Sequence, residues 1–217
     1  MSVEIDEETK QQVRQILTNI QDPVTLRVFL DRENCVYCNE TKNLVEQLAE
    51  MAPEGKLILD IHDCTEDKSP MEKYGIDKIP AIIVDNGETT NIRYFGIPAG
   101  YEFSALLEDI LDVSRGKTQF LSPNAQEYIK SIDEPVHIMV FVTPTCPYCP
   151  RAVRQAHAAA LLNKNITADM IESMEFQELA QKYSVYGVPK IVINEKVEIE
   201  GAPPEPMFIQ KLKEALA

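Results

Sequence analysis

The chain has 217 residues, 44% of them hydrophobic and 26% charged, which is enough for one large globular domain or two small ones with real cores. The net charge of −14 argues against DNA or RNA as a partner, because affinity for nucleic acids depends on Lys and Arg that neutralise phosphates. No run reaches the roughly 20 apolar residues of a membrane span, and the acidic N-terminus lacks the pattern of a secretory signal, so we expect a cytoplasmic protein with no membrane segment.

Hydrophobic periodicity and turn residues predict the same order of elements in each half of the chain. In the first half these are a helix at 7–20, a strand at 24–30, a helix at 39–51, a strand at 56–61, a helix ending near residue 74, a hairpin of strands 81–84 and 91–95, and a helix at 103–113. In the second half they are a helix beginning at Ser122-Pro123, a strand at 136–142, a helix at 151–162, a strand at 166–171, a helix ending near residue 183, a hairpin of strands 190–193 and 197–199, and a helix at 206–216.

Two Cys-x-x-Cys pairs recur within this order and mark the chain as an internal duplication. The pairs are Cys35–Cys38 and Cys146–Cys149, and an apolar-Pro step follows each of them, ending at Pro80 and Pro189. From the first cysteine to the proline the separations are 45 and 43 residues. A thiol pair and a remote proline that recur together predict one redox unit built twice.

The spacing of each pair suits redox chemistry. Residues three apart on a helix face the same way, so the two thiols can close a disulfide with little rearrangement. A helix N-terminus favours an anion, and the thiolate is the attacking species. We therefore predict Cys35 and Cys146 as nucleophiles, and Cys38 and Cys149, one turn in and more buried, as the thiols that resolve the mixed disulfide.

The order of elements, with Cys-x-x-Cys opening the first central helix and a proline opening the strand opposite, resembles the thioredoxin fold. Over both halves the chain resembles the protein disulfide oxidoreductases, also called glutaredoxin-like proteins, most clearly in the segment Thr143–Val153. The resemblance implies an α/β protein of two tandem thioredoxin-like units, each a central mixed sheet flanked by helices, with their sheets joined. The Arg-Gly-Lys step places the boundary near residue 115, which gives units 1–115 and 116–217.

By the same resemblance, Pro80 and Pro189 have cis peptide bonds beside the cysteines. This would leave the backbone of Ile79 and Val188 free to pair with an extended substrate segment. The tyrosines inside the motifs, Tyr37 and Tyr148, are further candidates for contact with substrate, or simply cover the disulfide.

A buried acid in the strand before the cysteines serves thioredoxin as a proton acceptor, and this chain has none there. Asp60 and Asp169, each 20 residues before its proline, are the candidates for that role, with a solvated strand end as the alternative. The fifth cysteine, Cys64, is interpreted as a lone thiol without a role.

The function implied is protein thiol–disulfide oxidoreductase, which forms, reduces or isomerises disulfides without a bound cofactor or metal. Protein disulfides would be its substrates and a flavin-dependent thioredoxin reductase its source of electrons. The C-terminal site, whose Pro147-Tyr148 is the dipeptide of glutaredoxins, is expected to dominate, because Val36-Tyr37 matches neither usual dipeptide. Two alternatives stay open: an electron carrier from the reductase to a peroxiredoxin, and a non-enzymatic scaffold whose cysteines are structural or bind metal.

Overall fold

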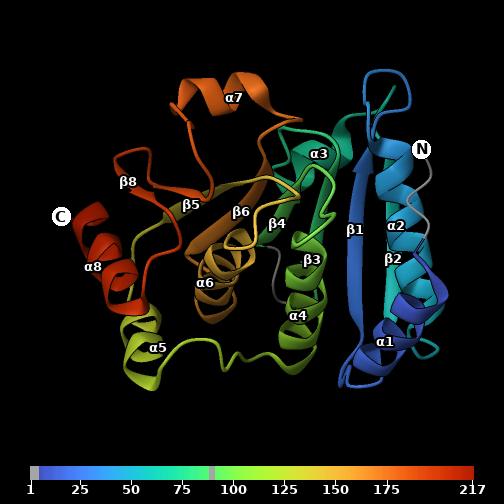
Figure 1. Cartoon of the computed structure of the whole chain (residues 1–217), viewed down its shortest axis with the longest axis horizontal. Helices are drawn as coiled ribbons and strands as arrows, with labels where there is room; N and C mark the ends of the chain where they lie inside the picture. The colour runs from blue at the N-terminus through green and yellow to red at the C-terminus, as the bar shows by residue number, and fades with distance from the viewer. Residues whose placement is uncertain (1–4, 88–90) are drawn as a thin grey trace.

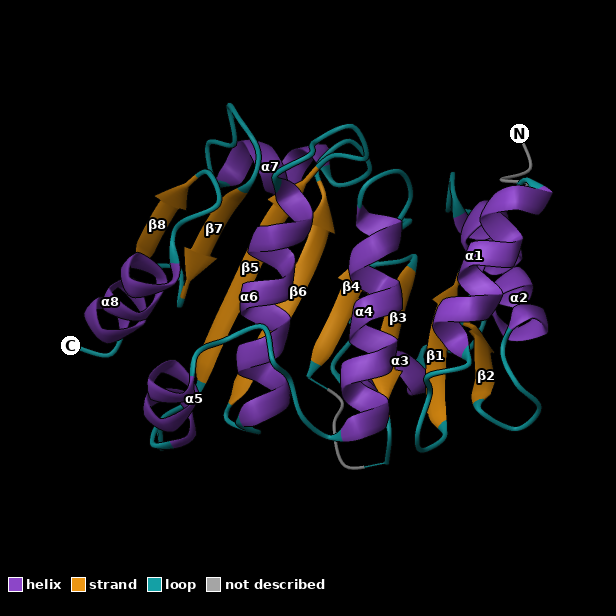
Figure 2. Cartoon of the chain, turned by 60° about the horizontal axis from the view of Figure 1, so that its bottom comes forward, coloured by secondary structure: helices purple, strands orange, loops and turns teal. Residues whose placement is uncertain are grey.

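A computed structural model describes residues 5–87 and 91–217 as one mixed sheet with helices on both faces (Figures 1 and 2). The first half contains α1 (Glu7–Leu17), β1 (Val24–Leu30), α2 (Cys38–Met51), β2 (Leu57–Asp63), α3 (Ser69–Tyr74), β3 (Ala81–Asp85), β4 (Ile92–Phe95) and α4 (Glu102–Arg115). The second half contains α5 (Pro123–Lys130), β5 (Val136–Val142), α6 (Cys149–Leu162), β6 (Ile166–Glu172), α7 (Gln177–Lys182), β7 (Lys190–Ile193), β8 (Val197–Glu200) and α8 (Glu205–Ala215).

The eight strands form one sheet in the order β2-β1-β3-β4-β6-β5-β7-β8. Within each half the first two strands are parallel and the last two form an antiparallel hairpin, as the sequence predicts. The halves join where β4 and β6 pair in parallel, with Ile92 opposite Ala168 and Phe95 opposite Ile171. The expectation of joined sheets is thus confirmed.

Element boundaries differ from the predicted ones by a few residues, and the reasons are local. The first helix ends at Leu17 rather than residue 20, because Thr18 and Asn19 bond their side chains back to the carbonyls of Gln15 and Ile16. The fifth helix begins as predicted, with Ser122 Oγ accepting a hydrogen bond from the N–H of Ala125. The loop between β3 and β4 includes residues 88–90, which lie outside the described residues.

Each face of the sheet has its own core. The larger core lies beneath the long helices α1, α2, α4 and α6, and the smaller one lies beneath the short helices α3 and α7 (Figure 2). Along β6, Ala168 and Met170 point into the larger core, whereas Ile171 points into the smaller one. This alternation decides which polar residues of a strand can reach the cysteines, because α2 and α6 lie over only one face.

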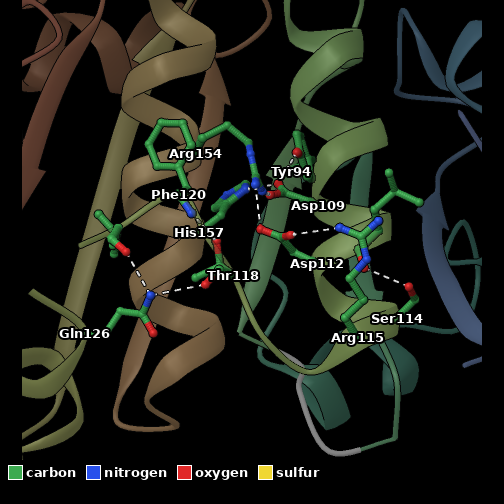
Figure 3. A network of polar contacts seen from close by, with 12 residues as sticks. Tyr94, Asp109, Asp112, Ser114, Arg115, Thr118, Phe120, Gln126, Arg154 and His157 are labelled. Atoms are coloured by element: carbon green, nitrogen blue, oxygen red, sulfur yellow. Dashed lines mark hydrogen bonds and ion pairs between the residues drawn. The ribbon is translucent and has the colours of Figure 1, made fainter. Parts of the chain in front are cut away.

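A buried group of charged side chains joins α4 to α6 (Figure 3). Asp109 accepts hydrogen bonds from Tyr94 and Arg154 and contacts Nδ1 of His157 at 2.5 Å, while Asp112 accepts from Arg154 Nη2 at 2.6 Å. Burial alone would raise the pKa of Asp109, but Arg154 and His157 hold it below its usual range. We call these five residues the Asp109 network. Since α4 and α6 come from different halves, the network ties the halves together beneath the sheet.

Candidate redox sites

Both cysteine pairs lie at the start of a helix, at the carboxyl ends of the central strands. Cys38 and Cys149 are the first residues of α2 and α6, so the leading cysteines lie just before the helices, a shift from the position that helix spacing predicts. Each pair is closed as a disulfide with its Cα atoms 5.5 Å apart. The chemistry inferred from the spacing is therefore accessible in both halves.

The two sites differ in how the backbone meets the sulfur atoms. At the C-terminal site the N–H of Cys149 points to Sγ of Cys146 at 3.1 Å, so the start of the helix donates to the leading sulfur. At the N-terminal site the donor is Asp31 N, and it meets the second sulfur, on Cys38, at 3.3 Å. The C-terminal geometry favours a negative charge on the leading sulfur, which is what a nucleophilic thiolate needs.

The apolar-Pro steps adopt the cis form that the resemblance implies, at Ile79–Pro80 and at Val188–Pro189. Sγ of Cys146 lies 3.7 Å from the carbonyl oxygen of Val188, so this peptide unit borders the C-terminal disulfide. Contact of these four residues with substrate stays a prediction.

Exposed apolar side chains surround the two disulfides. Tyr37 is 42% exposed and Tyr148 is 70% exposed, so both are placed where they can meet another protein. Two neighbours that sequence reasoning missed are more exposed still: Val36 at 82% and Tyr186 at 94%. Tyr186 lies two residues before Val188, and this closeness to the Val-Pro step was the signal that could have found it.

The structure gives Asp169 another role than the proton acceptor predicted for it. Its side chain is fully buried on the α7 face of the sheet, whereas Cys149 belongs to the core on the opposite face. Arg93 donates to it at 2.6 Å and His137 contacts it at 2.7 Å. Burial raises the pKa of Asp169, but His137 and Arg93 outweigh that effect and lower it. This is an ion pair between β4 and β6.

Asp60 lies on the same α3 and α7 face as Asp169. It accepts a short hydrogen bond from Arg27 of the neighbouring strand β1, with Nη1 and Oδ2 2.5 Å apart. A proton-acceptor role for either aspartate remains a prediction, and the contacts offer it no support.

Glu102 is a functional candidate that sequence reasoning missed. It is the first residue of α4 and is 1% exposed, and neither of its carboxyl oxygens has a hydrogen-bond partner. Burial raises the pKa of Glu102 to about 8, with a further contribution from Asp109. No sequence signal marks it, because an acidic residue in the first turn of a helix is ordinary and is usually solvated.

Two contacts place Glu102 near the C-terminal disulfide. The N–H of the preceding residue, Tyr101, donates to the carbonyl of Pro144, two residues before Cys146. Farther along, α4 meets α6 through Asp109 and Arg154 (Figure 3), so the two helices run side by side from a common end. The buried carboxyl therefore lies at the end of α4 that adjoins the start of α6.

Cys64 is the remaining cysteine. It is buried, and burial raises the pKa of its thiol, so it is a poor nucleophile. Within residues 5–87 and 91–217, no group of three or more His, Cys, Asp or Glu side chains could hold a metal ion, and no helix is both long and apolar enough to cross a membrane.

Comparison with known proteins agrees with this geometry. The family profile described as thioredoxin domain matches residues 136–214. The crystal structure of a protein disulfide oxidoreductase from Aeropyrum pernix superposes with a TM-score of 0.90, at 32% identity, over 98% of this chain and 94% of that one. The NTD_N/C domain of the alkylhydroperoxide reductase AhpF from Enterococcus faecalis has a TM-score of 0.85, at 26% identity, over 96% of this chain and 100% of that one.

Curated relatives are longer than this chain. The alkyl hydroperoxide reductase protein AhpF of Staphylococcus epidermidis is 29% identical over 191 residues, which cover 88% of this chain and 34% of that protein. The chain thus spans about a third of the length of the curated relatives it matches.

The fold and the two disulfides define a thioredoxin-fold dithiol oxidoreductase. With its two tandem units and its likeness to the Aeropyrum enzyme over nearly the whole chain, the protein belongs to the protein disulfide oxidoreductases and catalyses thiol–disulfide exchange.

Proposed function

We propose that the C-terminal site carries most of the exchange with protein disulfides, with Cys146 as nucleophile and Cys149 as resolving thiol. The observation that carries this assignment is the N–H of Cys149 at 3.1 Å from Sγ of Cys146, which stabilises a thiolate there. The Cys35–Cys38 site has its backbone donor on the second sulfur instead, so we assign it a lesser share of protein exchange.

Reduction of a substrate then proceeds in two balanced steps. The Cys146 thiolate attacks a substrate disulfide, forms a mixed disulfide and releases one substrate thiolate. The Cys149 thiol loses its proton and attacks Sγ of Cys146, which releases the second substrate thiolate and closes the enzyme disulfide. Two electrons pass to the substrate, and oxidation of a dithiol substrate is the reverse sequence.

We assign Glu102 as the group that takes the proton from Cys149. A buried carboxyl without hydrogen-bond partners has a pKa of about 8, so near neutral pH it can both accept and return a proton. Asp169 is less suited, because its carboxylate is committed to Arg93 and His137 on the other face of the sheet.

Substrate segments would lie across the peptide units of Val188–Pro189 and Ile79–Pro80, with main-chain pairing to Val188 and Ile79. Tyr148 would cover an apolar part of the substrate, and Tyr37 would do the same at the other site. Pairing through the backbone suits many sequences, which is what a general protein disulfide oxidoreductase needs.

Insulin reduction by dithiothreitol tests the division of labour. Cys146→Ser is expected to lose most of the activity and Cys35→Ser less of it, because only the C-terminal site has the helix donor on its leading sulfur. Cys64→Ser is the matched control and should keep the wild-type rate. Equal losses from Cys35→Ser and Cys146→Ser would contradict the assignment.

A second candidate function is that of a dedicated electron carrier. It is favoured by the match to the alkyl hydroperoxide reductase protein AhpF, which covers 88% of this chain. In this function a flavin-dependent thioredoxin reductase would reduce one site, and a peroxiredoxin would take electrons from the other. Reduction of many unrelated disulfide proteins at similar rates would rule it out, whereas fast reduction of a peroxiredoxin alone would support it.

A further inference from the structure

The turn after the last strand of each unit supports its cis proline. In the first unit the N–H of Gly96 donates to the carbonyl of Pro80 at 2.9 Å. In the second unit Gly201 donates to Pro189 at 2.8 Å. The turn therefore fixes the peptide unit that borders each disulfide, and the duplication has kept this contact in both units.

The turn of the first unit has a further support that comes from the other unit. The N–H of Ile97 donates to Oε1 of Glu175 at 2.6 Å, and Glu175 lies between β6 and α7. Ala202 occupies the place of Ile97 in the second unit, and no side chain in the described part of the chain accepts from its N–H. The second copy thus serves as an internal comparison, in which the same turn lacks a carboxylate.

The close approach of the two units at this point requires a glycine. Gly96 has φ +90°, and a Cβ atom there would lie 2.8 Å from Oε1 of Glu175 and 2.6 Å from Cβ of Glu172. The carboxyl of Glu175 is therefore packed directly against the backbone that holds Pro80. This seat is reached because β4 and β6 are neighbours in the joined sheet (Figure 1).

Other acidic groups surround this carboxyl. Glu172 Oε2 accepts from the N–H of Glu175 at 2.6 Å, and Glu40, two residues after Cys38 on α2, adds its charge. Burial raises the pKa of Glu175 to about 7, Glu172 and Glu40 raise it too, and the Ile97 N–H opposes them. The groove beside it carries four more charged side chains, Asp77, Lys78, Glu178 and Lys182.

We propose that Glu175 of the C-terminal unit is a positioning residue for the Cys35–Cys38 site, acting through Ile97 and Gly96 on the Ile79–Pro80 peptide unit. This deepens the proposed function and rests on it, since it assumes that Cys35–Cys38 exchanges disulfides. Glu175 holds the turn whether neutral or ionised, but the ionised form accepts the stronger hydrogen bond. Reactivity of the N-terminal site alone therefore changes as Glu175 titrates near pH 7.

The experiment compares the sites one at a time in the full chain. Cys146→Ser with Cys149→Ser leaves only the N-terminal site, and Cys35→Ser with Cys38→Ser leaves only the C-terminal site. Each background receives Glu175→Ala, which removes the acceptor, and Glu175→Gln, which keeps an acceptor oxygen but cannot ionise. Glu178→Ala, at an exposed residue of the same groove, is the matched control.

Insulin reduction is the first readout. Glu175→Ala is expected to lower the second-order rate at the N-terminal site about tenfold, the order of effect of losing a hydrogen bond to a charged group. Glu175→Gln should restore most of that rate at pH 6, and the C-terminal site should stay within about twofold throughout. An equal loss at both sites, or no difference between Glu175→Ala and Glu178→Ala, would overturn the positioning role.

The second readout needs no protein substrate. The rate at which dithiothreitol reduces the Cys35–Cys38 disulfide, followed from pH 5.5 to 8.5, should inflect near pH 7 with Glu175 and lose that inflection in Glu175→Gln. An inflection that survives the substitution would refute the proposal. Failure of the N-terminal site to reduce insulin would refute only its proposed activity, because the pH profile still tests Glu175.

Discussion

Glu102 is the residue whose chemistry depends most on its surroundings. In an unfolded chain it is an ordinary carboxylic acid with a pKa of 4.5, and in the folded protein burial raises that value to about 8. Between these values the folded state holds a proton that the unfolded state has lost. The contribution to stability is therefore complete below pH 4.5 and is lost as the pH rises through 8.

Glu102→Gln should flatten this part of the pH dependence of stability. The free energy of unfolding of the wild type is expected to fall by a few kcal/mol between pH 5 and 8.5, since each pKa unit is worth about 1.4 kcal/mol, and the variant should lose part of that fall. Urea unfolding at the two pH values measures it. Glu108→Gln, at an exposed position of the same helix, should leave the slope unchanged. A wild-type slope retained in Glu102→Gln would contradict the burial argument.

Among the elements, the loop from Gly96 to Tyr101 has the most consequence for the sites. At one end Gly96 supports Pro80, and at the other the N–H of Tyr101 holds the carbonyl of Pro144 at 3.0 Å, close to Cys146. Gly100 in this loop has φ +61°, and a Cβ atom there would lie 2.1 Å from the carbonyl oxygen of Pro144. The loop thus connects the surroundings of both disulfides, and it tolerates no side chain at Gly100.

Gly100→Ala is expected to destabilise the protein by more than its backbone strain. Gly116 has a similar φ of +60° but nothing within 4 Å of a Cβ atom, so Gly116→Ala carries the strain alone, about 1–2 kcal/mol. The difference between the two variants in urea unfolding isolates the clash with Pro144, expected at about 1–3 kcal/mol. Equal losses would mean that the loop moves away without cost.

At the scale of the whole molecule, the two units are held by the β4–β6 pairing and by the Asp109 network. The network places two carboxylates, a guanidinium, an imidazole and a phenol in the interior between α4 and α6 (Figure 3). Removing the positive partner would leave Asp109 and Asp112 buried without compensation.

Arg154→Met is expected to cost about 3–5 kcal/mol of unfolding free energy, the usual range for breaking a buried ion pair by removing one partner. Arg151→Met, at an exposed position of the same helix, should stay within about 0.5 kcal/mol of the wild type. Chemical denaturation followed by circular dichroism measures both. A loss no larger for Arg154→Met than for Arg151→Met would show that the network adds nothing to the association of the units.

Most of the fold could be predicted because its signals are local. The strands 24–30, 136–142 and 190–193 have the boundaries that their hydrophobic runs predict, and the Cys-x-x-Cys and apolar-Pro steps marked the two sites. The leading cysteines were misplaced by one turn, because spacing says that two residues can share a face but not where a helix begins. The division at residue 115 stays a prediction, although α4 ends there with Gly116 at φ 60°.

The amino-acid sequence by itself determined the duplication, the order of elements and the four cysteines, because each depends on residues close together in the chain. Tertiary structure alone decided the protonation of acids such as Glu102 and Glu175 and the pairing of Asp169 with Arg93. The pKa of a carboxyl depends on what surrounds it, and here the surroundings come from helices and strands of the other unit. Spacing along one chain carries no record of that packing.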